Sequence, residues 1–340
     1  MFLRMYCTKS EKKWYANHMA DKTCDIVLEG GGVKGIALVG ALRELDKAGY
    51  QHCRVAGTSA GAVVGSLLAA GMPFEDIDRL MRAVDYPAFR DESFLSRFSV
   101  PGKIASVLFT KGIYRGDYLE NWLAAQLDKF GVRTFADLKA GHDDLWAKDL
   151  PPERRYKLVV IVSDVSRGQL VRLPWDYHEY GLDPDKQTVA SAVRASMSIP
   201  YYYQPSKLRR RFLVDGGLLS NFPLDIFDAA GDWPTFGVKL SAKADALSKM
   251  NPVTNSLNYG LAILSTAMGA HDQMHLDQPA AQARTVFVDT FGIRATDFEI
   301  SNEQQEALYE SGRQAARTFL KSWDFAEYKR QFPLVRRGGS

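Results

Sequence analysis

Residues 24–35 read CDIVLEGGGVKG, and this stretch decides how the rest of the chain is interpreted. Its apolar run, residues 25–29, is typical of a short buried strand. A glycine cluster that meets the G-x-G-x-x-G pattern ends the run. Two explanations fit this pattern, because its backbone N–H groups can hold either the phosphate of a dinucleotide or another kind of negative charge.

The residues that follow alternate between helix and strand patterns. Residues 36–48 carry apolar side chains on one helical stripe, and Gly49 ends that helix. Residues 54–56 predict a second short strand, and residues 60–70 predict a helix of small residues that packs tightly. Because a β-α-β-α order requires parallel strands covered by helices, we expect an α/β fold with a mainly parallel central sheet.

The rest of the chain continues this organisation. Further strands are predicted at residues 156–162, 211–215, 235–240 and 285–289, and further helices at residues 189–196, 255–276 and 302–322. Residues 73–150 are mainly helical and predict a cap inserted over the sheet. We expect one domain at residues 24–322, with an accessory segment at 1–23 and a C-terminal tail at 323–340.

Composition narrows the class of protein. The apolar fraction of 46% and the charged fraction of 24% are those of an ordinary globular protein. The net charge of +3 is too small to indicate a nucleic-acid-binding protein. The one dense basic run, residues 207–211, has two explanations: a solvated hairpin turn, or a contact with anionic lipid or another acidic partner.

The chain shows no pattern for metal binding, disulfides or membrane spans. Its three cysteines lack C-x-x-C spacing, and no run of 18 apolar residues predicts a transmembrane helix. We therefore expect no metal and a cytoplasmic protein that associates peripherally with membranes. Residues 1–22 lack the apolar region of a signal peptide, so a cleaved signal is not expected. Export by a route that needs no cleaved signal stays open.

A second glycine motif, Gly57-Thr-Ser-Ala-Gly61, stands between the second strand and the small-residue helix. The G-x-S-x-G pattern places a serine on a sharp turn where side chains at the glycine positions would collide with backbone. The turn exposes the Ser59 hydroxyl at the positive end of the helix. A helix-capping serine is the alternative, but the strand–turn–helix context favours a nucleophile.

Ser59 decides between the two explanations of the first glycine cluster. A dinucleotide site needs an acidic residue at the end of the second strand to hold a ribose hydroxyl, and none stands there. Loops that follow adjacent parallel strands lie side by side, so residues 30–32 are expected beside Ser59. The glycine N–H groups then form an oxyanion hole, with each donor worth about 2.7–4 kcal/mol. This disfavours a nucleotide-dependent oxidoreductase.

The serine also needs a base. None of the six histidines stands on a strand-end turn suited to that role. Asp215 does, because it ends a predicted strand and precedes Gly216 and Gly217, which let the backbone turn closely around it. A carboxylate can accept the serine proton directly if burial raises its pKa.

The three motifs together resemble the patatin-like phospholipases. The stretches at residues 112–118, 194–200 and 303–320 fit the same family, so the resemblance covers about residues 24–322. It implies a three-layer α/β/α fold and a Ser59–Asp215 dyad that acts without a metal or other cofactor. It further implies an oxyanion hole centred on Gly31 and Gly32 and shaped by Gly30 and Gly35.

The implied activity is hydrolysis of fatty-acyl esters through an acyl-enzyme, most simply those of a phospholipid or lysophospholipid. Two alternatives stay open: a lipid transacylase, and a lipid-binding sensor that has lost turnover on the same fold. Lys34 stands where the family has Arg or Lys, as a structural or phosphate-facing charge. Apolar side chains of the cap are candidates for contacts with lipid or for simple core positions: Phe89, Phe94, Leu95, Phe98 and Phe109.

Overall fold

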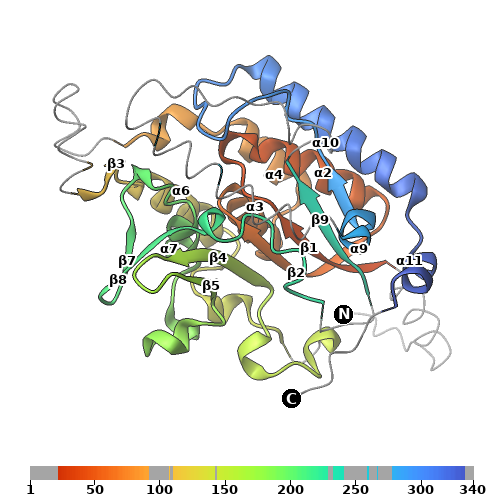
Figure 1. Ribbon diagram of the computed structural model, residues 1–340, viewed down its shortest axis with the longest axis horizontal. Helices are drawn as coiled ribbons and strands as arrows, with labels where there is room; N and C mark the ends of the chain where they lie inside the picture. The colour runs from red at the N-terminus through yellow and green to blue at the C-terminus, as the bar shows by residue number, and fades with distance from the viewer. Residues whose placement is uncertain are drawn as a thin grey trace, which may run out of the picture.

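The computed structural model describes residues 22–91, 107, 110–141, 144–228, 233–240, 259, 266 and 278–333. Its centre is an eight-stranded sheet in the order β10-β9-β1-β2-β4-β8-β7, with β5 also paired to β4 (Figure 1). The parallel strands are β1 (Thr23–Leu28), β2 (Gln51–Thr58), β4 (Leu158–Asp164), β9 (Thr235–Lys239) and β10 (Thr285–Phe287). The strands β5 (Gln169–Leu173), β7 (Ser206–Leu208) and β8 (Arg211–Asp215) run antiparallel to their neighbours. The predicted α/β fold with a mainly parallel sheet is confirmed.

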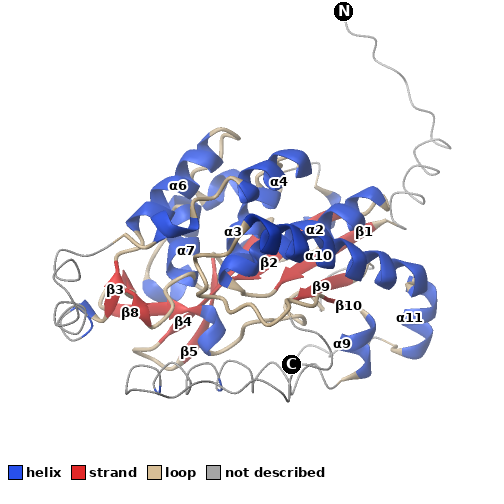
Figure 2. Ribbon diagram, turned by 90° about the horizontal axis from the view of Figure 1, so that it is seen from above, coloured by secondary structure: helices blue, strands red, loops and turns tan. Residues whose placement is uncertain are grey.

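Helices cover this sheet. Figure 2 shows α2, α3, α7 and α10 stacked together on one side of the strands. The described helices are α2 (Gly35–Lys47), α3 (Ala60–Ala69), α4 (Phe74–Arg82), α6 (Asp117–Asp128), α7 (Val189–Ser196), α9 (Pro279–Ala283), α10 (Asn302–Ser322) and α11 (Phe325–Gln331). Within the segment expected as a cap, α4 packs on α2 and α3, and α6 packs on α7. The segment expected as a tail contains α11.

Several predicted elements agree with the structure residue by residue. The helices at α7 and α10 and the strand β8 have the predicted bounds. The predicted helix at residues 255–276 lies outside the described residues, apart from two isolated positions. The sequence analysis missed β5, β7 and a small second sheet of β3 (Gly112–Tyr114) and β6 (Tyr201–Tyr203).

A buried ion pair joins the beginnings of β1 and β2. The Arg54 backbone N–H and Nε donate to Asp25 Oδ1 at 3.1 and 3.0 Å, and Trp233 Nε1 donates to Asp25 Oδ2 at 2.9 Å. Arg54 and Asp25 are each 1% exposed. This pair explains why a charge stands inside β2, where Arg54 precedes Ser59 by five residues.

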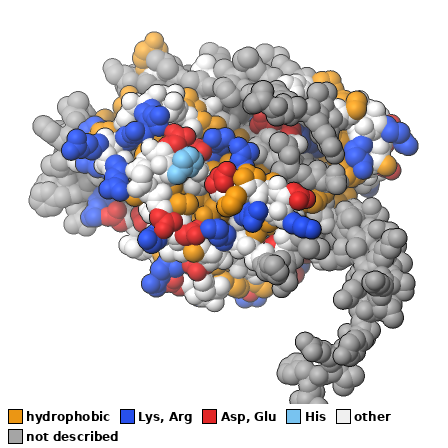
Figure 3. Space-filling view, turned by 90° about the horizontal axis from the view of Figure 1, so that it is seen from below, with side chains coloured by type: hydrophobic (Ala, Val, Ile, Leu, Met, Phe, Trp, Pro, Cys, Tyr) orange, Lys and Arg blue, Asp and Glu red, His pale blue; other side chains and the backbone are white. Residues whose placement is uncertain are grey.

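The described surface carries both signs of charge. Figure 3 shows Lys and Arg side chains lying among Asp and Glu side chains on the face seen from below, in keeping with the small net charge. Across the described ranges, no helix is long and apolar enough to span a membrane. The same residues contain no group of three or more His, Cys, Asp or Glu side chains placed to bind a metal ion.

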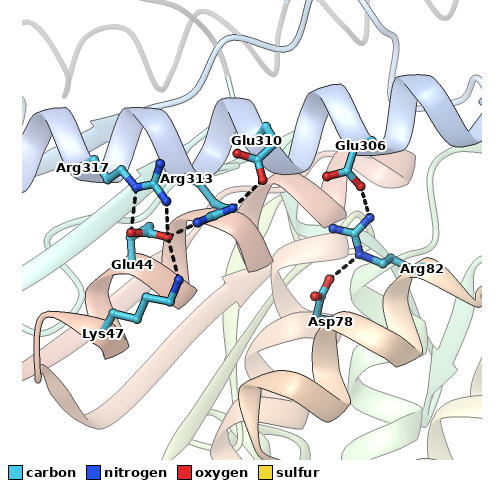
Figure 4. A network of polar contacts seen from close by, with 8 residues as sticks. All are labelled: Glu44, Lys47, Asp78, Arg82, Glu306, Glu310, Arg313 and Arg317. Carbon is cyan, nitrogen blue, oxygen red and sulfur yellow. Dashed lines mark hydrogen bonds and ion pairs between the residues drawn. The ribbon is translucent and has the colours of Figure 1, made fainter.

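A polar network fixes α10 against α2 and α4 (Figure 4). Glu44 on α2 accepts hydrogen bonds from Arg313 Nε at 2.8 Å and from Arg317 Nε at 2.9 Å. On α4, Arg82 binds Asp78 at 2.6 Å and also contacts Glu306 of α10. Burial alone would raise the pKa of Glu44, but hydrogen bonds from Arg317, Arg313 and Lys47 outweigh it and lower the pKa to about 2.

Replacing Glu44 with Gln therefore lowers the free energy of unfolding by about 1–2 kcal/mol at neutral pH. The pKa is lower in the folded protein, so this stabilisation is fully present above about pH 4.5 and is lost as the pH falls toward 2. Denaturant unfolding across that window checks this, with Glu310→Gln, a more exposed partner of Arg313, as the control. A difference between wild type and Glu44→Gln that stays constant down to pH 2 contradicts the prediction.

Candidate active site

Ser59 stands on a strained turn between β2 and α3. Its backbone has φ 52° and ψ −123°, in a region that non-glycine residues rarely adopt. A Cβ on Gly57 would lie 2.3 Å from the Gly61 carbonyl oxygen, and a Cβ on Gly61 would lie 2.3 Å from the Leu28 carbonyl oxygen. The two glycines thus allow the close backbone approach that holds Ser59 in this conformation.

Ser196 of α7 ties this turn to the sheet. The Ser59 N–H donates to Ser196 Oγ at 2.8 Å, and the Ser196 hydroxyl donates to the Ile161 carbonyl of β4 at 2.6 Å. Both serines are buried. The Ser196 hydroxyl therefore binds the Ser59 N–H and the Ile161 carbonyl, two backbone groups that lack a partner in the sheet because of the sharp turn.

Asp215 ends β8 and reaches Ser59 across β4. Thr58 pairs with Ile161, and Val162 pairs with Asp215, so both residues come to the same edge of the sheet. The Asp215 carboxylate accepts a hydrogen bond from the Gly217 N–H at 2.8 Å, and the Ser59 side chain lies close enough to lower the pKa of this carboxyl. The Ser59 hydroxyl also lies 3.3 Å from Met197 Sδ.

The surroundings of Asp215 raise its affinity for a proton. The residue is 1% exposed, and burial raises the pKa of its carboxyl to about 7 even though the Gly217 N–H and the Ser59 side chain lower it. Among the described residues, no Lys, Arg or His side chain forms an ion pair with Asp215. A carboxylate of this kind is suited to accept a proton near neutral pH.

The glycine cluster curves beside this pair. A Cβ on Gly30 would lie 3.1 Å from the Ser59 Cβ. The Gly30 N–H donates to the Asn221 carbonyl at 3.2 Å, and the Gly35 N–H donates to the Gly32 carbonyl. The Gly31 and Gly32 N–H groups donate to no other residue within the described part of the chain. Within the described residues, these two donors are therefore without a competing acceptor.

Contacts from three segments fix the cluster. Asn221 Nδ2 donates to the Gly30 carbonyl at 3.1 Å, so Asn221 binds both backbone groups of Gly30. The Val33 N–H donates to the Ala295 carbonyl at 3.1 Å, and Gly32, at φ 56°, has no room for a Cβ against that same carbonyl. Lys34 Nζ lies 3.5 Å from the Leu240 carbonyl oxygen.

An apolar pocket lies behind Ser59. It is lined by Gly32, Val33, Ala60, Val63, Met81, Val84, Phe89, Leu119, Trp122, Met197 and Phe298. The space between these side chains is about 20 Å³, room for about one water molecule. Of the apolar cap residues proposed from the sequence, Phe89 is buried in this lining, whereas Phe94, Leu95, Phe98 and Phe109 lie outside the described residues.

The described histidines stay away from the site. His52 lies at the beginning of β2, at the far end from Ser59, and His178 Nδ1 lies 2.7 Å from the Trp175 carbonyl. The sequence predicts no role for Ser196, Met197 or Asn221. Ser196 and Met197 stand in the stretch at residues 194–200, and Asn221 follows Asp215 by six residues, but only the fold shows what they contact.

The amino-acid sequence of this chain matches one protein family and several individual proteins. The sequence profile of the patatin-like phospholipases matches residues 26–228. The uncharacterised protein YqhO of Bacillus subtilis is 37% identical over 88% of this chain and 99% of its own length. The lysophospholipase nte1 of Emericella nidulans is 25% identical over 72% of this chain, which spans only 14% of that protein.

A solved structure shares the fold. The crystal structure of VipD from Legionella pneumophila has a TM-score of 0.54 and 19% sequence identity, and the match covers 88% of this chain and 67% of that one. At this identity the likeness concerns the fold alone.

Replacing Asp215 with Asn raises the stability of the protein above neutral pH. Because the pKa of Asp215 is raised in the folded state, the wild type loses stability as the pH rises from about 3.8 to about 7. Asn does not ionise, so the free energy of unfolding of the variant exceeds that of the wild type by up to about 4 kcal/mol at pH 8 and by almost nothing at pH 4. Thermal unfolding at both values checks this against Asp149→Asn, an exposed control. Equal melting temperatures for wild type and Asp215→Asn at pH 8 contradict it.

Proposed function

The chain belongs to the patatin-like phospholipase family, and we propose that it is a serine hydrolase that cleaves fatty-acyl esters of phospholipids or lysophospholipids. Membership supports a lipid hydrolase at the level of the family. The name of the fungal relative supports a lysophospholipid as one substrate. The observation that carries the proposal is the buried Asp215 carboxyl, with a pKa of about 7 to which the nearby side chain of the strained Ser59 contributes.

The proposed first step forms an acyl-enzyme. Asp215 takes the proton of the Ser59 hydroxyl as the Ser59 oxygen bonds to the ester carbonyl carbon. The negative charge that develops on the carbonyl oxygen is held by the Gly31 and Gly32 N–H groups, and each such donor contributes about 2.7–4 kcal/mol. The bond to the alcohol then breaks, and the alcohol leaves with the proton that Asp215 returns.

The proposed second step releases the fatty acid. Asp215 takes a proton from a water molecule whose oxygen attacks the acyl carbonyl, and the same glycine donors hold the second oxyanion. The bond between Ser59 and the acyl group breaks, and Ser59 recovers its proton from Asp215. One carboxyl group thus serves as base and acid in turn, which suits a pKa near 7.

The apolar pocket supports an acyl chain as the group that enters the site. Its lining includes Gly32 of the proposed oxyanion hole and Ala60 next to the proposed nucleophile, together with the apolar Val84, Phe89 and Leu119. The space of about 20 Å³ is too small for a chain until side chains move. Met81 and Met197 line the pocket, and unbranched thioether side chains change rotamer easily.

Replacing Ser59 with Ala removes the proposed nucleophile and leaves the backbone turn in place. Hydrolysis of a lysophospholipid should fall at least about 10³-fold, and covalent labelling by a fluorophosphonate should be lost. The control is Ser66→Ala, a buried serine of the same helix whose hydroxyl donates to the Val63 carbonyl. Wild-type hydrolysis by Ser59→Ala would overturn the assignment.

The same measurements separate two other functions. A sensor that has lost turnover takes up the fluorophosphonate at Ser59 or binds lipid, yet releases no fatty acid. A transacylase releases little fatty acid until a second lipid is added and then produces an acylated acceptor.

Filling the pocket should shorten the acyl chains that the enzyme accepts. Val84→Phe is expected to lower kcat/KM about tenfold for a long-chain p-nitrophenyl ester and to leave the butyrate ester nearly unchanged, because each buried methylene contributes about 0.8 kcal/mol. Val132→Phe is the control, since Val132 is equally buried but outside the lining. A parallel loss for both esters in Val84→Phe contradicts this role.

A further inference from the structure

We propose that the β7–β8 hairpin is a docking element for the anionic lipid headgroups of a membrane surface, an inference that rests on the proposed lipid substrate. The hairpin contains the basic run at residues 207–211, for which the sequence alone allows two explanations. Its turn is formed by Arg209 and Arg210, between Ser206–Leu208 and Arg211–Asp215. At the left of Figure 1 it extends away from β4 and β5.

Several cations gather at this hairpin without carboxylate partners. Lys207, Arg209 and Arg210 are exposed, and Lys111 joins them from the loop before β3. Lys111 Nζ lies 5.0 Å and Lys207 Nζ lies 5.6 Å from the centre of the Phe212 ring. Among the described residues, none of these four cations lies within ion-pair distance of an Asp or Glu.

Elsewhere on the described surface, cations are commonly paired with acids. Ion pairs hold Arg79 to Asp76, Arg133 to Asp128 and Arg330 to Glu327, all with exposed partners. Among the described residues of the hairpin, Arg211 alone forms an ion pair: it stands next to the turn and binds the buried Asp164 at 3.8 Å, so its charge is directed back toward β4. Among the described residues, the tip therefore presents positive charge that no acidic side chain compensates.

Apolar side chains flank these cations. Val165, in the turn between β4 and β5, is 47% exposed, and its N–H donates to the Phe212 carbonyl at 3.1 Å. Tyr201 is 42% exposed and pairs with Gly112, the neighbour of Lys111. Cations beside exposed apolar and aromatic side chains suit the interface of an anionic bilayer. The anionic headgroups bind the cations, and the aromatic rings lie at the boundary between headgroups and acyl chains.

The hairpin points beyond the edge of the sheet that holds the site. Leu213 pairs with Asp164, the last residue of β4, so Arg211 extends two residues past the end of that strand. From Asp215 to Arg211 the strand covers roughly 13 Å at 3.3 Å per residue. Ser59 stands at that same edge, because Thr58 pairs with Ile161. Contact of the tip with a membrane therefore turns the Ser59 edge toward lipid.

Vesicle binding by a charge-reversed protein tests the proposal. The variant combines Lys207→Glu, Arg209→Glu and Arg210→Glu. The matched control combines Lys129→Glu, Lys148→Glu and Arg154→Glu, which changes the net charge equally; Lys148 and Arg154 precede β4 and so lie at the opposite edge. Each protein is sedimented with vesicles of phosphatidylcholine alone or with about one-third phosphatidylserine.

The wild type and the control should bind the phosphatidylserine vesicles at least about tenfold more tightly than the hairpin variant does. That preference should weaken as salt is added. Equal binding by the hairpin variant, an equal loss in the control, or no preference of the wild type for phosphatidylserine overturns the proposal. So does tighter binding of the wild type to a double-stranded DNA fragment than to the vesicles.

Two further measurements keep the outcome interpretable. If the Glu variant fails to fold by circular dichroism, the corresponding triple Gln variant replaces it. Hydrolysis of a water-soluble short-chain ester should be unchanged in the hairpin variant, because the substituted side chains lie outside the site. Loss of vesicle binding with intact hydrolysis supports the docking role, whereas intact binding by a wild type that hydrolyses no ester refutes the proposed function alone.

Discussion

The structure of this site depends on the burial of one carboxyl group, that of Asp215. An unpaired carboxylate away from water is costly, and the described surroundings offer it a hydrogen bond from Gly217 and the nearby Ser59 side chain rather than a cation. The pKa of about 7 is the direct result. The antiparallel pairing of β8 with β4 sets this position, because it brings the end of β8 level with the end of β2.

The other residues of the site hold the backbone of its loops in conformations that regular strands and helices do not adopt. Gly57 and Gly61 allow the turn at Ser59, Ser196 satisfies its backbone, and Asn221 binds both polar groups of Gly30. Most of the polar groups in these loops are thereby used, and the N–H groups of Gly31 and Gly32 remain as donors within the described residues. Strain and exposed donors at one edge of a sheet are typical of a site built for developing negative charge.

Much of this arrangement could be predicted from the sequence, and the rest depends on contacts between distant segments. The apolar runs of β1, β2 and β4 and the glycine motifs that end two of them have local signatures, so the fold class and the neighbourhood of Ser59 follow from them. The short strands β5 and β7 have no such signature, because they form only by pairing with β4 and β8. The parts played by Ser196 and Asn221 and the lining of the apolar pocket likewise appear only when segments over 100 residues apart meet.

The central claim is that the buried Asp215 activates Ser59, and the pH dependence of covalent labelling tests it most directly. The second-order rate constant for fluorophosphonate labelling of the wild type reports the first chemical step without a lipid interface. We expect the labelling rate to rise with pH to a plateau, with a midpoint near 7, as Asp215 loses its proton. A midpoint near the usual carboxyl value of about 4, or an unchanged profile in Asp215→Asn, would contradict it.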